Sequence, residues 1–122
     1  MSFCILAVED DPNILISIEF LLTNAGYDVL TAADGTQAWD ALQAHHPDLV
    51  VLDIMLPEID GFELCRRIRA AATLKATKVM ILSARGRDVE IEKGTQLGAD
   101  AYLRKPFGTH EFLDIVSRLL KS

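Results

Sequence analysis

An acidic residue closes one of the most apolar stretches of this sequence. Residues 49–53 read LVVLD, so Asp53 follows four consecutive apolar residues that are typical of a buried strand. Burying an ionised carboxylate without a partner is unfavourable, so the group must meet a cation or give up its charge. Asp53 therefore predicts that a positively charged group lies close to it in the folded chain.

Polar side chains also follow other apolar runs of the chain. The residues in such positions are Glu9, Asp10, Asp11, Ser83 and Lys105. If the runs are parallel strands, their carboxyl ends share the edge of the sheet at which open α/β folds bind ligands. We therefore expect carboxylates, a hydroxyl and an ammonium group to meet in one site, because one site explains their common register better than separate coincidences.

This combination of groups favours phosphoryl transfer to a carboxylate. Clustered acids repel one another unless a hard divalent cation joins them, and oxygen ligands favour Mg²⁺, with Mn²⁺ as an alternative. Lys105 is a point charge that suits a phosphoryl group, and the Ser83 hydroxyl could donate a hydrogen bond to the same group. Asp53 would then be the nucleophile that forms an aspartyl phosphate.

Each of these residues also has a plainer interpretation. Lys105 taken alone could be a surface ammonium, Ser83 a turn residue and Asp53 a helix N-cap. Asp11 is expected to be only an N-cap, because Pro12 after it suits the first position of a helix. The functional interpretation rests on the coincidence of positions at successive strand ends and on no single residue.

Strand-like and helical patterns alternate along the chain. Strands are predicted over residues 3–8, 27–32, 49–52, 79–82 and 101–103, and helices over residues 12–25, 35–45, 61–71, 88–97 and 109–120. This alternation predicts the α/β fold class, with a three-layer, doubly wound (βα)5 domain around a five-stranded parallel sheet. Strands that are covered on both faces read as continuous apolar runs, as these do.

The composition limits the classes of protein to which the chain can belong. Its 122 residues suffice for one domain with its own core, so residues 1–122 are expected to form a single domain. The net charge of −6 argues against direct binding to nucleic acid or to a membrane surface. The chain shows no membrane-length apolar run and no secretory signal pattern, which favours a cytoplasmic protein with reduced thiols at Cys4 and Cys65.

A set of short motifs follows the whole chain in a fixed order. The motifs are Glu9-Asp10, Asp53 with Met55 and Pro57, Asp60-Gly61, Ser83-Ala84, Gly98-Ala99-Asp100, Tyr102 and Lys105-Pro106-Phe107. Together they resemble the receiver domain of two-component response regulators, from Ile5 to the last helix. Single dipeptides are unspecific, but this order and spacing are highly specific. The resemblance implies a flavodoxin-like strand order, 2-1-3-4-5.

The resemblance also implies a phosphoacceptor and a metal site. Asp53 would take a phosphoryl group from the phosphohistidine of a sensor histidine kinase or of a phosphotransfer protein. Asp10, Asp53 and the main-chain carbonyl of Met55 would hold Mg²⁺, and Glu9 would act through a bound water. Met55 and Arg85 resemble the residues that tune the lifetime of the phosphoryl group.

Further residues are implied to read out the phosphorylated state. Lys105, aimed by a cis peptide bond to Pro106, would pair with Asp53 at rest and with the phosphoryl group afterwards. Ser83 would move toward the phosphoryl group, and Tyr102 would change rotamer to fill the space. The linked shift would remodel the surface of the fourth helix, fifth strand and fifth helix, which an unknown downstream protein would read.

One part of the implied partner surface departs from the family pattern. Receivers joined to winged-helix DNA-binding domains generally dimerise through ion pairs on the face of the fourth and fifth helices. The matching positions here hold apolar residues, namely Ile91, Leu97, Ala101 and Ile115. A dimer locked by charges on this face is therefore not expected.

The expected function is a phosphoacceptor signalling switch rather than an enzyme, one that assists its own phosphorylation and dephosphorylation. A stand-alone regulator or phosphorelay member is slightly favoured over an excised receiver of a DNA-binding response regulator or of a hybrid kinase. A phosphatase of the haloacid-dehalogenase type would need a second acid where Met55 stands. A flavin carrier would need a phosphate loop where Glu9 and Asp10 stand. A pseudo-receiver would bind partners without phosphorylation.

Overall fold

Five β-strands and five α-helices alternate along the described part of the chain, residues 3–83 and 88–121 of a computed structural model. The strands are β1 (Cys4–Val8), β2 (Asp28–Ala32), β3 (Leu49–Asp53), β4 (Lys78–Ser83) and β5 (Ala101–Arg104). The helices are α1 (Pro12–Asn24), α2 (Gly35–His45), α3 (Gly61–Ala70), α4 (Asp88–Gln96) and α5 (Thr109–Lys121), with a short 3₁₀ turn, η1 (Ala72–Leu74). None of the helices within these described ranges is long and apolar enough to cross a membrane.

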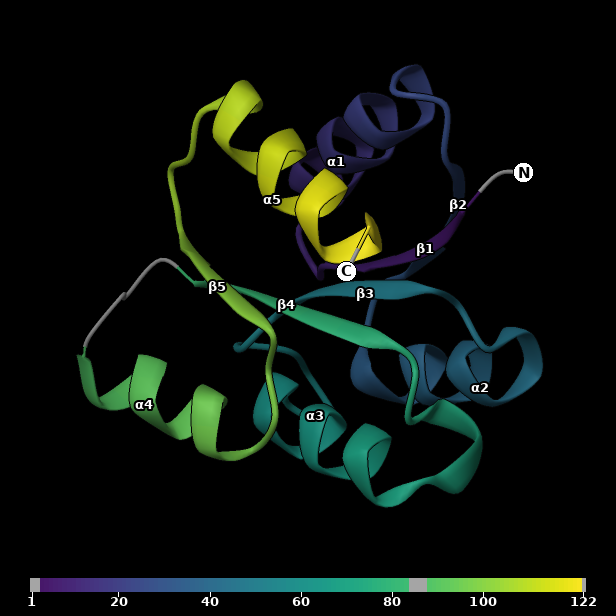
Figure 1. The fold of residues 1–122 in the computed structure, drawn as a ribbon, viewed down its shortest axis with the longest axis vertical. Coiled ribbons are helices and arrows are strands. Elements are labelled where there is room, and N and C mark those ends of the chain that lie inside the picture. The colour runs from purple at the N-terminus through teal and green to yellow at the C-terminus, as the bar shows by residue number, and fades with distance from the viewer. Residues whose placement is uncertain (1–2, 84–87, 122) are drawn as a thin grey trace.

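The strands form one parallel sheet in the order β2-β1-β3-β4-β5. Helices α1 and α5 cover one face of this sheet, and α2, α3 and α4 lie on the other (Figure 1). The three-layer, doubly wound fold and the flavodoxin-like strand order are therefore confirmed. Since all strands are parallel, their carboxyl ends meet at one edge, which we call the carboxyl edge, and the opposite edge is the amino edge.

Alternate residues of each strand enter two separate cores. In β1, Ile5 and Ala7 pack with residues of α1 and α5, whereas Leu6 and Val8 pack with residues of α2 and α3. All four of these side chains are at most 1% exposed. Burial on both faces is the reason that the strands read as unbroken apolar runs.

The starts of α1, α2 and α3 are stabilised by local side-chain caps. Asp11 accepts hydrogen bonds from the amides of Asn13 and Ile14, so the predicted N-cap is confirmed. Asp34 and Asp60 cap α2 and α3 in the same way. These caps fix where each helix leaves the carboxyl edge.

The observed boundaries differ from the predicted ones at positions that matter for the site. β3 and β4 each extend one residue further, to Asp53 and Ser83, because the ladder continues beyond the apolar pattern: Asp53 pairs with Leu82, and Ser83 with Arg104. Phe3 was predicted to start β1 but lies outside it and is 40% exposed. Asp53 and Ser83 are thus held by strand pairing and not by loops.

Candidate functional site

Asp53, the last residue of β3, has the cationic partner that its position requires. The residue is 8% exposed. Its Oδ2 accepts a hydrogen bond from Lys105 Nζ at 2.9 Å, and its Oδ1 accepts one from the Met55 amide at 3.0 Å. Both carboxylate oxygens are therefore held in fixed directions by groups that favour the charged form.

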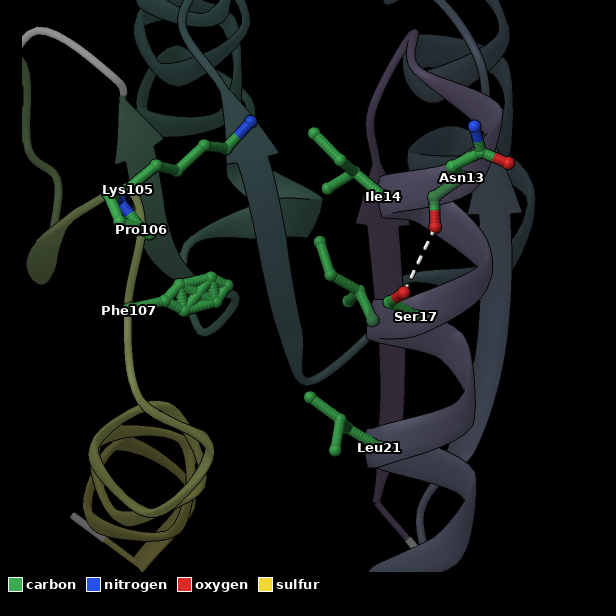
Figure 2. A pocket seen from close by; sticks show the side chains of 8 residues that line it. Asn13, Ile14, Ser17, Leu21, Lys105, Pro106 and Phe107 are labelled. Carbon is green, nitrogen blue, oxygen red and sulfur yellow. Dashed lines mark hydrogen bonds between the residues drawn. The ribbon is translucent and has the colours of Figure 1, made fainter.

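Lys105 bridges two carboxylates, not one. Besides contacting Asp53, its Nζ donates to Glu9 Oε1 at 2.8 Å. Its main-chain amide donates to the Ser83 carbonyl at 2.8 Å, and its peptide bond to Pro106 is cis. The side chain reaches into the site from the segment that follows β5, beside Pro106 and Phe107 (Figure 2). The direct contact with Glu9 was not predicted, because the resemblance implied only a water-mediated role for Glu9.

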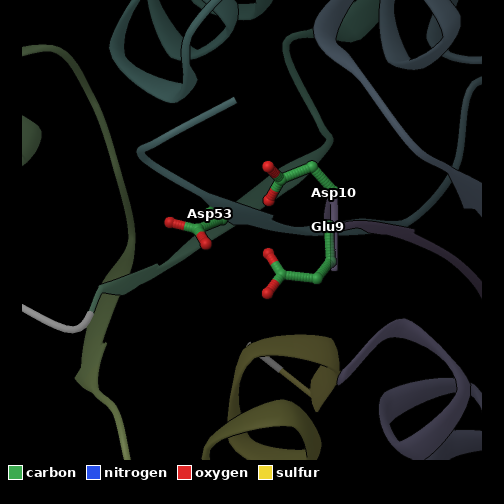
Figure 3. A group of neighbouring side chains, drawn as sticks. All are labelled: Glu9, Asp10 and Asp53. Atoms are coloured by element: carbon green, nitrogen blue, oxygen red, sulfur yellow. The ribbon is translucent and has the colours of Figure 1, made fainter. Parts of the chain in front are cut away.

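Three carboxylates meet at the carboxyl edge. One oxygen from each of Glu9, Asp10 and Asp53 lies within 4.8 Å of the others, and the three groups point toward one another (Figure 3). Asp10 is exposed, whereas Glu9 is 2% exposed. Glu9 Oε2 is buried and has no hydrogen-bond partner among the described residues. An unpartnered buried acceptor beside two further carboxylates fits a hard divalent cation, and Mg²⁺ in particular.

Glu9, Asp53 and Lys105 shift one another's pKa. Burial raises the pKa of Glu9 to about 7, and Asp53 adds to this rise while Lys105 opposes it. Burial also acts to raise the pKa of Asp53, but the interactions with Glu9, Lys105 and the Met55 amide outweigh it, so that pKa is lowered. Burial acts to lower the pKa of Lys105, and the two carboxylates outweigh it in turn. Asp53 is therefore ionised and Lys105 charged at neutral pH.

Ser83 lies at the same edge as the acidic cluster. It is the last residue of β4, it is 1% exposed, and it follows Leu82, the residue that pairs with Asp53. The Ile54 amide donates to the Leu82 carbonyl at 3.3 Å, which ties the chain after Asp53 to the end of β4. The Ser83 hydroxyl is thus on the strand next to the carboxylate.

Of the remaining predicted site residues, the structure describes Tyr102 and Met55. Tyr102, paired with Ile81 in the sheet, is partly buried, and its hydroxyl is buried without a hydrogen-bond partner in the described ranges. Met55 has a 57% exposed side chain beside Asp53. Arg85 lies outside the described residues.

The apolar residues of the α4–β5–α5 surface are partly committed to the core. Ile91, Leu97, Ala101 and Ile115 are all partly buried. Leu97 packs on the core beneath α3, and Ala101 and Ile115 pack on the core beneath α5. Part of the apolar area of these residues therefore belongs to the core, and only the rest is available to a partner.

An apolar groove that the sequence did not reveal begins beside Lys105. It encloses about 600 Å³ between α1 and the segment after β5, with Ile14 and Leu21 facing Pro106 and Phe107 (Figure 2). The signal in the sequence was the near absence of charge on α1, whose only charged residue is Glu19. Two large apolar side chains of α1 are also exposed, Ile16 at 63% and Phe20 at 64%.

Comparison with known proteins identifies the family. The model of the response regulator receiver domain matches residues 5–117. Response regulator Rre1 of Synechocystis sp. is 40% identical over 117 residues, which cover 95% of this chain and 51% of that protein. The chain spans about half the length of the curated relatives that it matches.

Solved structures agree in fold over the whole chain. The receiver domain of sensor histidine kinase PA1611 from Pseudomonas aeruginosa PAO1, solved with a magnesium ion coordinated in the active site cleft, superposes with a TM-score of 0.91 at 34% identity and complete coverage of both chains. Chemotaxis protein CheY4 of Vibrio cholerae gives a TM-score of 0.92 at 30% identity, covering 98% of this chain and 99% of that one. The chain therefore belongs to the response regulator receiver domain family, the signalling domains of two-component systems.

Proposed function

We propose that this chain is a phosphoacceptor switch in which Asp53 receives a phosphoryl group from the phosphohistidine of a histidine kinase or of a phosphotransfer protein. The observation that carries the proposal is the Asp53–Lys105 contact of 2.9 Å beside a cluster of three carboxylates. An ionised carboxylate, a fixed ammonium and a set of hard oxygen ligands are what transfer to an aspartate requires.

The transfer forms one bond and breaks another. A carboxylate oxygen of Asp53 attacks phosphorus, the P–N bond to the donor imidazole breaks, and its electron pair leaves with the imidazole, so an acyl phosphate forms. Mg²⁺ held by Asp10, Asp53 and the Met55 carbonyl, with Glu9 acting through a water, would offset the charge of the phosphoryl oxygens. Lys105 Nζ, already 2.8–2.9 Å from two carboxylate oxygens, would contact the transferred group.

The readout would pass through Ser83 and Tyr102. Ser83 ends the strand that neighbours Asp53, so its hydroxyl is suited to turn toward a phosphoryl group there. The Tyr102 hydroxyl has no hydrogen-bond partner among the described residues, so a change of rotamer would break no hydrogen bond of that kind. Such a change would alter the α4–β5–α5 surface presented to a downstream protein.

The groove beside α1 supports the approach of a donor protein from that side. Lys105 belongs both to the groove and to the site, so a protein seated against Ile14 and Phe107 would hold an imidazole close to Asp53. One receiver domain over residues 1–122 would serve equally in a stand-alone regulator and in a longer response regulator or hybrid kinase.

Intact mass spectrometry after incubation with acetyl phosphate tests the proposal. We expect one phosphoryl adduct that requires Mg²⁺ and that is absent from Asp53→Asn. Fast hydrolysis could deplete the adduct, so binding of beryllofluoride in the presence of Mg²⁺ is measured in parallel. If no adduct forms and beryllofluoride does not bind either, the phosphoacceptor role is rejected and a pseudo-receiver is favoured.

A further inference from the structure

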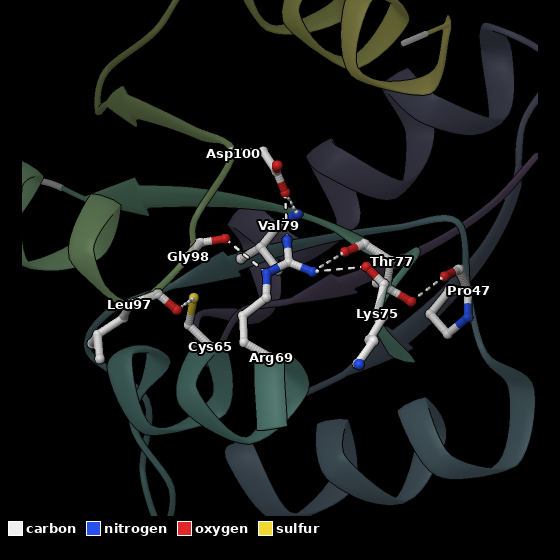
Figure 4. Close-up of polar contacts among 9 residues, drawn as sticks. All are labelled: Pro47, Cys65, Arg69, Lys75, Thr77, Val79, Leu97, Gly98 and Asp100. Atoms are coloured by element: carbon white, nitrogen blue, oxygen red, sulfur yellow. Dashed lines mark hydrogen bonds and ion pairs between the residues drawn. The ribbon is translucent and has the colours of Figure 1, made fainter. Parts of the chain in front are cut away.

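Arg69, near the end of α3, contacts two other segments with one side chain. Its Nε donates to the Gly98 carbonyl at 2.8 Å, and its Nη1 donates to the Thr77 carbonyl at 2.7 Å. Its Nη2 pairs with Asp100 Oδ2 at 2.6 Å (Figure 4). The guanidinium therefore joins α3 to the start of β4 and to the turn between α4 and β5.

The turn between α4 and β5, residues 97–100, is held by further bonds. Asp100 Oδ2 also accepts from the Val79 amide at 2.8 Å, and the Asp100 amide donates to the Val79 carbonyl at 2.8 Å. Cys65 Sγ, one turn before Arg69 on α3, donates to the Leu97 carbonyl at 3.4 Å. We call the group formed by Arg69, Asp100 and the Gly98 and Thr77 carbonyls the Arg69 clamp.

The turn is shaped around the arginine. Gly98 has a φ of 99°, a left-handed conformation, and a Cβ added there would lie 2.6 Å from Arg69 Cγ. The Arg69 and Asp100 side chains are 25% and 28% exposed, so their ion pair is less screened than a pair at the surface. Charge-assisted hydrogen bonds of this geometry are among the stronger ones in proteins.

The clamp lies at the end of α4 that is far from Asp53. α4 follows β4, whose last residue Ser83 is at the carboxyl edge, and its last turn leads into β5 at the amino edge. Through Asp100, the clamp fastens the turn that follows α4 to Val79, near the start of β4. A strand rises about 3.3 Å per residue, so roughly 13 Å separate Val79 from Ser83.

We infer that the Arg69 clamp makes the α4–β5 turn the fixed end of α4, so that phosphorylation of Asp53 displaces the helix mainly at its first turns. The direction of the displacement rests on the proposed function, whereas the clamp itself is present in the resting protein. Arg69 is thus a positioning residue of the switch, since it touches none of the groups at the carboxyl edge that would react.

Hydrogen exchange measured by mass spectrometry tests this inference in the full chain, with and without Mg²⁺ and beryllofluoride. The turn has its own reporters, because the Gly98 amide donates to Thr95 and the Ala99 amide to Gly94. Arg69→Met is compared with Arg66→Met, since Arg66 is on the same helix and, among the described residues, its side chain donates hydrogen bonds to Glu63. Resting Arg69→Met should exchange about tenfold faster than Arg66→Met over residues 97–100.

The activated state should separate a positioning role from a merely stabilising one. In the wild type and in Arg66→Met, beryllofluoride should change exchange in the first turns of α4 and leave residues 97–100 unchanged. In Arg69→Met the change should extend into the turn. Asp100→Asn keeps an acceptor for the Val79 amide, so it should change exchange in the same direction as Arg69→Met but by less. It serves as the test variant if Arg69→Met does not fold.

Three results would overturn the inference. They are equal resting exchange over residues 97–100 in Arg69→Met and Arg66→Met, a beryllofluoride response within that turn in the wild type, and a response in Arg69→Met that stays confined to the first turns of α4. Failure of the proposed function looks different, because beryllofluoride would then change nothing while the resting difference between the two arginine variants persisted.

Discussion

The two edges of the sheet differ in how well the hydrogen-bonding capacity of their charged groups is satisfied. At the carboxyl edge one ammonium, Lys105, serves two carboxylates, and a buried oxygen of Glu9 has no hydrogen-bond partner in the described part of the chain. At the amino edge one guanidinium, Arg69, uses three nitrogen atoms, and Asp100 Oδ2 accepts from both Arg69 and the Val79 amide. The carboxyl edge has too few donors for its acceptors, whereas the amino edge is well supplied with both.

This difference separates a site that awaits a ligand from one that holds a structure. A buried acceptor without a donor is costly unless an ion or a water completes it, so the carboxyl edge is suited to gain a cation and a phosphoryl group. Substitutions at the carboxyl edge should therefore change chemistry and ligand binding. Substitutions at the amino edge should change stability and local opening while phosphorylation continues.

The largest expected effect is on chemistry at the carboxyl edge. Lys105→Met removes the ammonium that contacts Asp53 and keeps a long unbranched side chain. Acetyl phosphate should then phosphorylate the protein about 10²–10³-fold more slowly, as expected when a fixed donor to developing charge is lost. Initial rates come from intact mass, and Lys121→Met, at an exposed position in α5, should keep the wild-type rate. Equal rates in the two variants would show that the Lys105 ammonium does not accelerate phosphoryl transfer.

A smaller effect, on stability, is expected at the amino edge. Gly98 and Gly26 have φ values of 99° and 97°, but only Gly98 has a neighbour, Arg69, where a Cβ would lie. Gly26→Ala should lower the free energy of unfolding by about 1–2 kcal/mol through backbone strain alone. Gly98→Ala should lower it by about 3 kcal/mol, because overpacking against Arg69 adds to the same strain. Urea unfolding measures both, and equal losses would show that the arginine stem yields without cost.

Addition of Mg²⁺ should also distinguish the two edges, through a smaller change in the free energy of unfolding. At a concentration ten times its Kd, Mg²⁺ should raise the wild-type free energy of unfolding by about 1.4 kcal/mol. Asp10→Asn removes one carboxylate of the cluster and should lose most of this increment, whereas Arg69→Met should retain it. Thermal or urea unfolding with Mg²⁺ or with EDTA gives the increments. An Arg69→Met protein that loses the increment would show that the two edges are not independent.

Most of the fold could be predicted from the sequence, because local patterns determine it. The unbroken apolar runs indicated parallel strands covered on both faces, and Asp11 followed by Pro12 marked a helix start. The strand ends were less predictable, since hydrogen-bond pairing continues past the apolar residues to Asp53 and Ser83. Pairing is decided by the neighbouring strand, which the local pattern does not contain.

The candidate site was predictable as a set of positions but not as a set of contacts. Topology alone gathers Glu9, Asp53 and Lys105 at one edge. The sequence did not show that Lys105 contacts Glu9, a residue 96 positions away, since spacing along the chain says nothing of where a long side chain ends. Arg69 was missed for a similar reason, because nothing in the sequence of α3 distinguishes it from Arg66.

The smallest effect that should separate the edges is on the pH dependence of stability. The pKa of Glu9 is raised from 4.5 to about 7 in the folded protein, first by burial and then by Asp53. The folded state therefore binds more protons than the unfolded state between pH 4.5 and 7, so the contribution of Glu9 is present below pH 4.5 and is lost as the pH rises through 7. Measured in EDTA, the stability of the wild type relative to Glu9→Gln should fall by about 1 kcal/mol from pH 6 to pH 7. Arg69→Met should show the same fall relative to its Glu9→Gln double variant, and a flat difference in both would place Glu9 in a well-solvated environment.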